Sequence, residues 1–221
     1  MRLTLTLTLT LTLMSGVLLA ACASKPVPPS WQPNAKEALD GFTDDYLRGN
    51  TADANAEFAR ARRETTSTGR ADLVAQVELV RCAVLSASLE FDGCPGFVAL
   101  ANDATAGQRA YAAYLDGRWD GLDVAALPEQ HRAVVAGGGL PATADPLAQL
   151  VAAGALLKAG RIRPEAIAAA AQTASEQGWR RPLLVWLGVA LQQARAAGDT
   201  AAAARLERRI ALAGGARMSL E

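Results

Sequence analysis

The sequence holds few residues that could carry out acid–base or metal chemistry. His131 is the only histidine, so a Ser-His-Asp triad would depend on that one side chain, and no serine lies near it in sequence. We expect His131 to be solvated or partly packed. Zinc needs three or four well-placed ligands, and the sequence contains no such cluster and no glycine-rich phosphate loop. We therefore expect no catalytic, metal or cofactor site.

Closely spaced carboxylates are the remaining candidates for catalysis. They are Asp44 with Asp45, Glu90 with Asp92, and Asp116 with Asp120 and Asp123. Two facing acids can hydrolyse a glycosidic bond, which keeps an enzyme open as an alternative. Because acids are abundant on any solvated surface, we favour a protein that is not an enzyme.

Two features are candidates for binding a protein partner. Arg60, Arg62 and Arg63, with Arg70 after them, form a basic patch that could dock an acidic partner, although a solvated helix face is the favoured explanation. Trp119 lies in a glycine-flanked loop, where an exposed aromatic ring could anchor a partner. The 22 basic and 22 acidic residues cancel, which gives no reason to expect nucleic acid as a partner.

The N-terminus has the layout of a secretory signal peptide. Arg2 precedes an uncharged stretch in which leucine and threonine alternate over residues 3–13, followed by small residues. The stretch is too short and too rich in threonine to span a bilayer comfortably. Leu19-Ala20-Ala21-Cys22 resembles the lipobox of bacterial lipoproteins.

This resemblance implies that residues 1–21 are removed and that Cys22 becomes a lipidated N-terminus. Several acyl chains together would hold the protein stably on a membrane. Ala23 follows the cysteine where an aspartate would favour inner-membrane retention, so the resemblance implies the outer membrane, facing the periplasm. The alternative is an ordinary secretory leader cut after Ala23. Residues 22–33, with four prolines after the cysteine, would form an extended spacer of roughly 30 Å.

With Cys22 assigned to lipid, Cys82 and Cys94 are left as an even pair. In the oxidising compartment that the leader implies, such a pair predicts a disulfide, here between a helix and the turn Asp92-Gly-Cys-Pro-Gly96. A redox-active or metal-binding pair is the alternative, but no Cys-x-x-Cys motif supports it.

From Asn34 onward the sequence predicts helices and no convincing strand. Helix starts are marked by Asn34 with Glu37, by Thr105 with Gln108, by Asp145-Pro146 and by Asp199. Glycines mark most of the ends. Eight or nine helices of 10 to 20 residues with short connections are typical of antiparallel helical hairpins.

A weak internal repeat resembles tetratricopeptide (TPR) repeats. Tyr46-Leu47-Arg48-Gly49-Asn50 recurs as Tyr114-Leu115-Asp116-Gly117-Arg118, and Ala54, Phe58 and Ala61 follow the first copy. The expected fold is thus all-α, either a short TPR-like solenoid or an irregular helical bundle.

The expected organisation is a leader over 1–21, a spacer over 22–33, and two helical halves over 34–136 and 140–215, joined at Gly137–Gly139. TPR-like lipoproteins of the bacterial envelope hold partner proteins in a helical groove. The resemblance therefore implies a membrane-anchored adaptor or assembly factor. The alternatives are an envelope enzyme acting on the cell wall and a purely structural lipoprotein.

Overall fold

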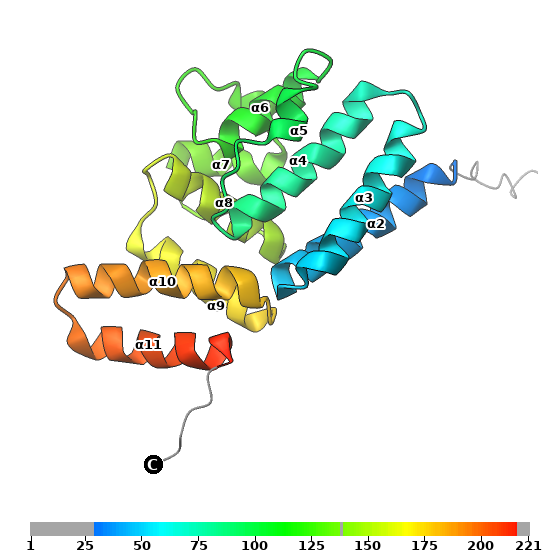
Figure 1. The fold of residues 1–221 in the computed structure, drawn as a ribbon. Helices are drawn as coiled ribbons and strands as arrows, with labels where there is room; N and C mark the ends of the chain where they lie inside the picture. Colours follow the sequence, from blue (N-terminus) through cyan, green and yellow to red (C-terminus); the bar gives the residue numbers. More distant parts are fainter. Residues whose placement is uncertain (1–28, 138, 216–221) are drawn as a thin grey trace, which may run out of the picture. The chain divides into compact units, whose positions relative to one another are not determined.

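The computed structural model describes residues 29–137 and 139–215, and the chain from Trp31 onward forms one compact unit. Within these ranges the protein is all-helical, with ten α-helices, one short 3-10 helix and no strand (Figure 1). The expected all-α fold is confirmed. The expected signal peptide, Cys22 and most of the expected spacer lie outside the described residues.

The first two helices form an antiparallel hairpin, α2 (Trp31–Arg48) and α3 (Thr51–Thr66). Gly49 makes the turn between them with a φ of 101°, a conformation that side chains with a Cβ rarely adopt. The prediction that α2 begins after a cap at Asn34 is wrong, because the helix already includes Trp31. Pro33 is tolerated there since the N–H groups of a first helical turn have no partner within the helix.

The central helix of the fold is α4 (Ala71–Ala87), which is buried over most of its length. It contacts α2, α3, α5 (Pro95–Val98), α6 (Ala106–Leu115) and α8 (Pro146–Lys158). The predicted capping box before α6 is confirmed, since Thr105 and Gln108 each accept a hydrogen bond from the other's backbone N–H. Two short elements follow, η2 (Val124–Ala126) and α7 (Glu129–Gly137).

The contact between α4 and α8 brings two backbones very close together. A Cβ added at Gly154 of α8 would lie 2.3 Å from the carbonyl oxygen of Ser86 on α4. The predicted start of α8 is confirmed, with Asp145 accepting from the backbone N–H groups of Leu147 and Ala148 and Pro146 in the first turn.

Three consecutive helices complete the chain: α9 (Pro164–Glu176), α10 (Arg180–Ala196) and α11 (Thr200–Gly214). Each packs on the next, and Asp199 caps α11 as predicted. Two long-range hydrogen bonds fix α10 to the N-terminal helices. Trp186 Nε1 donates to the carbonyl of Ala87 at 3.0 Å, and Arg181 Nε donates to the carbonyl of Tyr46 at 2.7 Å.

The two expected halves share one hydrophobic core. Buried side chains from Phe42 in α2 to Leu187 in α10 belong to a single cluster. Consecutive helices pack as hairpins at both ends of the described chain, whereas α4 packs on α8 across a long stretch of sequence. The architecture therefore combines repeat-like hairpins with a bundle-like centre. Among the described helices, none combines the length and apolar character that crossing a bilayer requires.

The α4–α8 contact can be tested with a matched pair of helical glycines. Gly154→Ala should lower the free energy of unfolding by about 2 kcal/mol, because the new methyl group forces α8 away from α4. Gly188→Ala in α10 should raise it by about 0.5–1 kcal/mol, because its Cβ meets nothing within 4 Å and alanine favours helix. Urea denaturation measures both. Equal effects at the two positions would contradict the close approach of α4 and α8.

Candidate functional site

A cavity of about 550 Å³ lies between α4, α6, α8 and the segment that leads from η2 into α7. We call it the central pocket and define it by the side chains of Gln76, Leu79, Tyr111, His131, Asp145 and Leu147. This volume is typical of sites that hold a small molecule or a few side chains of a partner.

Helical spacing and caps place these residues. Gln76, Leu79 and Val80 fall on one face of α4 because residues three and four apart share a helix face. Gln108 and Tyr111 are likewise one turn apart on α6. Asp145 is held at the rim because its carboxylate caps α8. In the sequence, Gln108 and Asp145 are recognisable only as capping residues, and no local signal marks Tyr111.

His131 lines the central pocket and packs against the rings of Tyr111 and Tyr114. Its side chain is 2% exposed, so the expectation of a solvated or partly packed ring is wrong. The Tyr114 hydroxyl lies 3.2 Å from His131 Nδ1, and the Tyr111 and Tyr114 ring centroids lie 5.5 and 4.9 Å from that of His131. With Nδ1 engaged, Nε2 is the ring nitrogen left without a partner within the described residues.

The aromatic cluster continues from the pocket to Trp119. The rings of Tyr114 and Trp119 stack with centroids 5.5 Å apart, and Trp119 Nε1 donates to the Tyr114 carbonyl at 2.9 Å. The Arg161 guanidinium lies over the Trp119 ring, 5.2 Å from the ring centroid. Trp119 is only 9% exposed, so the expected exposed anchor in a loop is a packed side chain instead. The indole N–H found its partner in the backbone of the preceding helix, a pairing that sequence spacing did not reveal.

Burial keeps the pocket's titratable rings neutral. Burial lowers the pKa of His131 to about 4, against a smaller opposing effect of the Asp145 carboxylate. Burial also raises the pKa values of Tyr111 and Tyr114 above their usual range. Asp145 is the only acidic residue among those that line the pocket, and no lysine or arginine lines it.

The predicted basic patch lies on α3, away from the central pocket, and is largely paired. Arg60 forms an ion pair with Glu57 at 2.7 Å, and Arg62 pairs with the buried Glu78 at 2.8 Å. Arg63 is exposed and makes no ion pair within residues 29–137 and 139–215. Internal ion pairs thus account for Arg60 and Arg62, two of the arginines proposed to bind an acidic partner.

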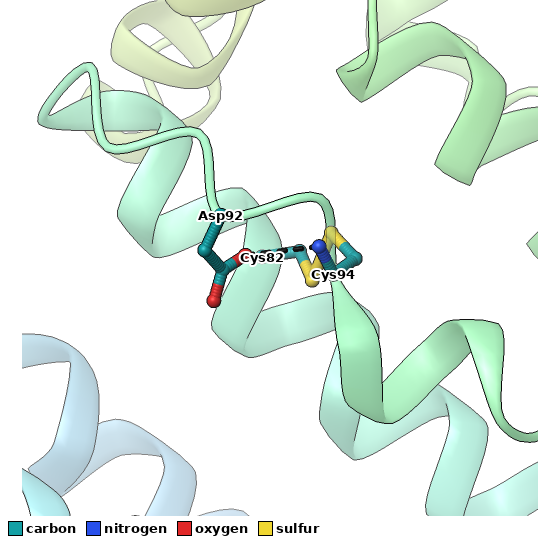
Figure 2. A group of neighbouring side chains, drawn as sticks. All are labelled: Cys82, Asp92 and Cys94. Atoms are coloured by element: carbon teal, nitrogen blue, oxygen red, sulfur yellow. Dashed lines mark hydrogen bonds between the residues drawn. A yellow bond between two sulfur atoms is a disulfide. The ribbon is translucent and has the colours of Figure 1, made fainter.

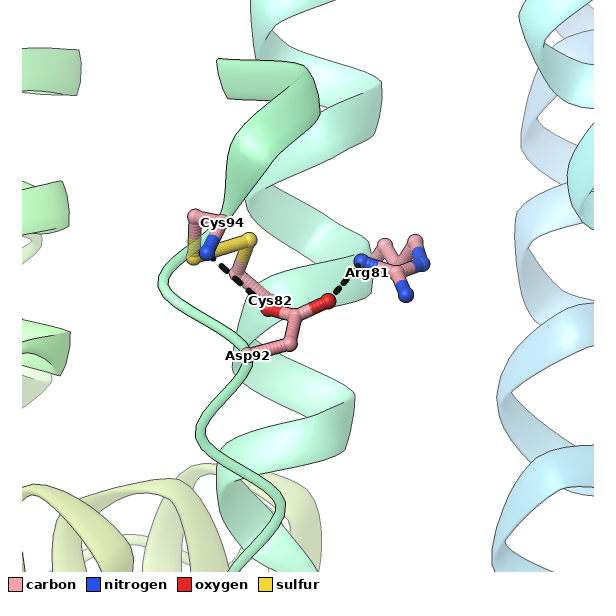
Figure 3. The surroundings of a disulfide bond; sticks show 4 residues. All are labelled: Arg81, Cys82, Asp92 and Cys94. Atoms are coloured by element: carbon pink, nitrogen blue, oxygen red, sulfur yellow. Dashed lines mark hydrogen bonds and ion pairs between the residues drawn. A yellow bond between two sulfur atoms is a disulfide. The ribbon is translucent and has the colours of Figure 1, made fainter. Parts of the chain in front are cut away.

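Cys82 and Cys94 form a disulfide, with their Cα atoms 5.7 Å apart. Figure 2 shows Asp92 beside the two sulfurs, and its carboxylate oxygen and both sulfurs lie within 4.8 Å of one another. The carboxylate accepts from Cys94 N at 2.9 Å and from Arg81 Nη1 at 2.7 Å (Figure 3). The sulfurs are bonded to each other and the carboxylate is engaged twice, so the group acts here as a structural staple between α4 and the following loop.

Four of the seven acids expected as catalytic candidates, Asp44, Glu90, Asp92 and Asp116, form ion pairs with arginines. Glu90, Asp92 and Asp116 line a second cavity of about 330 Å³ beside the disulfide. Their partners are Arg181 at 3.2 Å, Arg81 at 2.7 Å and Arg118 at 2.7 Å, respectively. Although burial alone would raise it, the pKa of Asp92 is held below its usual value by Arg81 and the Cys94 N–H. A general acid for glycoside hydrolysis needs the opposite shift.

The buried neutral histidine predicts a specific pH dependence of stability. Below about pH 6.5 the unfolded chain binds a proton at residue 131, whereas the folded protein binds one only near pH 4. The free energy of unfolding should therefore fall as the pH drops through this window, and His131 should account for about 2 kcal/mol of the loss between pH 7 and pH 5. Urea denaturation of the wild type and of His131→Gln at several pH values isolates the contribution of His131 to this loss of stability. Parallel pH profiles for the two proteins would show that His131 is not the group responsible.

Comparisons with known proteins identify no relative of this chain. No protein-family model matches this chain, and neither a curated protein nor a solved structure is significantly similar to it.

Proposed function

We propose that this protein is a membrane-anchored lipoprotein of the bacterial envelope that acts as a non-enzymatic adaptor. In this proposal it binds a segment of an envelope protein in the central pocket. The observation that carries the proposal is the pocket itself, a cavity of about 550 Å³ that is open to solvent and whose walls come from four separate parts of the chain.

The lining suits a polypeptide segment better than a highly charged ligand. Val80 and Leu147 supply partly exposed apolar surface, and the exposed Gln76 and Gln130 supply amide groups at the rim. Side-chain amides both donate and accept hydrogen bonds, as a peptide backbone does. An apolar floor with a few polar groups around it is also typical of binding sites that are formed before the ligand arrives.

The leader supports the proposed location. Leu19-Ala20-Ala21-Cys22 resembles a lipobox, and the following proline-rich residues would separate the lipid from a helical body that begins at Trp31. The disulfide between Cys82 and Cys94 suits a compartment outside the cytoplasm. The outer membrane, with the body facing the periplasm, is the location we propose.

The central pocket distinguishes this proposal from its two alternatives. A purely structural lipoprotein needs no cavity lined by aromatic and amide groups. A cell-wall hydrolase needs two facing acids, and the central pocket is lined by one, Asp145, while the acids of the second cavity are each paired with arginine.

Site-specific crosslinking tests the adaptor proposal in cells. A photo-crosslinking amino acid in place of Gln76, at the rim of the pocket, should give one reproducible adduct with a protein of the envelope, identified by mass spectrometry. The same amino acid in place of Gln193, an exposed glutamine of α10 outside the pocket, should not give that adduct.

A second pair of variants shows whether the adduct depends on the pocket. Gln130→Trp, which fills the rim, should abolish the adduct from position 76, whereas Gln193→Trp should leave it unchanged. An adduct that survives Gln130→Trp, or that forms equally from position 193, would exclude the central pocket as the binding site.

Anchoring is tested separately at the cysteine. Cys22→Ser should leave an unprocessed or unanchored product, because the thiol is the acceptor for the lipid in the proposed maturation. Membrane fractionation, and gel mobility with and without an inhibitor of lipoprotein signal peptidase, measure the change. Normal processing and membrane retention of Cys22→Ser would overturn the proposed anchor and leave the pocket proposal to its own test.

A further inference from the structure

The electrostatics of the central pocket narrow the class of group that it can bind. Asp145 is the only carboxylate among the side chains that line it, and no lysine or arginine is among them. A carboxylate or phosphate entering the pocket would find no countercharge and would face Asp145. A neutral or positively charged group meets neither obstacle.

The Asp145 carboxylate has capacity for an additional partner. One oxygen, Oδ1, accepts from the backbone N–H groups of Leu147 at 2.9 Å and Ala148 at 3.3 Å. The other oxygen, Oδ2, makes no hydrogen bond within the described part of the chain. The charge also acts within the pocket, since Asp145 contributes electrostatically at both His131 and Tyr111.

The Tyr111 hydroxyl lines the same cavity and makes no hydrogen bond within residues 29–137 and 139–215. The Asp145 carboxylate and this hydroxyl are therefore two acceptors in one pocket. In the tautomer of His131 that carries its proton on Nδ1, donated to the Tyr114 oxygen, Nε2 is a third. An alkylammonium group has three N–H donors to match them.

The apolar part of the lining suits the hydrocarbon stem that would carry such an ammonium group. Val80 and Leu147 can cover a short hydrocarbon stem, and the face of the Tyr111 ring attracts a cation through its quadrupole. We propose that the central pocket binds an ammonium group on an apolar stem, with Asp145 as its countercharge. This inference rests on the proposed function and names the chemistry that the partner must present. The ammonium group comes either from a lysine side chain of the partner or from a free alkylamine.

A titration with four small probes tests the inference on the full-length protein in detergent micelles, followed by NMR chemical shifts. The probes are pentylamine, N-acetyl-lysine methylamide, 1-pentanol and pentanoate. Both ammonium probes should shift resonances of pocket residues, and pentylamine should bind about two- to fivefold more tightly than pentanol, the range expected for one exposed ion pair. Pentanoate should not bind. Tighter binding of the lysine derivative indicates a partner side chain, and tighter binding of pentylamine indicates a free amine.

Asp145→Asn provides the decisive variant, because asparagine caps a helix about as well as aspartate but carries no charge. It should weaken pentylamine binding about two- to fivefold and leave pentanol binding unchanged. Asp199→Asn, the same change at the cap of α11 outside the pocket, should alter neither. Asp145→Ser, which also caps without charge, should reproduce Asp145→Asn. Thermal melts confirm that each variant is folded.

The outcomes separate this inference from the adaptor proposal. Equal binding of pentylamine and pentanol, no binding of either ammonium probe, or no effect of Asp145→Asn would overturn the inference about ammonium groups. If the crosslinked adduct from position 76 nevertheless remained sensitive to Gln130→Trp, the adaptor proposal would stand and only the proposed ligand chemistry would fall.

Discussion

The close contact between α4 and α8 sets the spacing of two of the four walls of the central pocket. Gly154 allows the two backbones to approach so closely that no side chain fits between them at the carbonyl of Ser86. Because α4 carries Gln76 and Leu79 while α8 starts at its cap on Asp145, the position of one helix relative to the other sets the width of the cavity. Van der Waals packing at this density changes sharply with small displacements, so the pocket depends on a contact that contains none of its own residues.

The rest of the molecule is arranged around that contact. On one side, the aromatic cluster of His131, Tyr114 and Trp119 joins α6 and α7 to the core. On the other, Trp186 and Arg181 of α10 bond to carbonyls near the ends of α4 and α2, which holds the C-terminal hairpins against the N-terminal one. These hydrogen bonds satisfy backbone carbonyls at helix ends, groups that have no partner within the helix. The two long-range hydrogen bonds of α10 are therefore made to backbone carbonyls near the ends of α2 and α4.

Local signals in the sequence predicted the helices well and the pocket poorly. Thr105, Asp145 and Asp199 each cap a helix as expected, because capping depends on residues within one turn. The start of α2 was misplaced since proline is compatible with both a spacer and a first helical turn. The burial of Trp119 and His131 depends on helices that meet only in the folded chain, and flanking glycines or sequence neighbours carry no information about it. For the central pocket, the Gln108–Tyr111 spacing was the one available clue, and it became meaningful only beside α4 and α8.

The loop beside the disulfide is attached to α4 twice. The Cys82–Cys94 bond joins it covalently, and the Asp92 carboxylate joins it through the Arg81 guanidinium on the helix. The same carboxylate accepts from the backbone N–H of Cys94, which holds Asp92 against the residue that carries the second sulfur. One attachment can be cut by a reductant and the other cannot. The structure thus supplies the loop with a restraint that does not depend on the redox state of its surroundings.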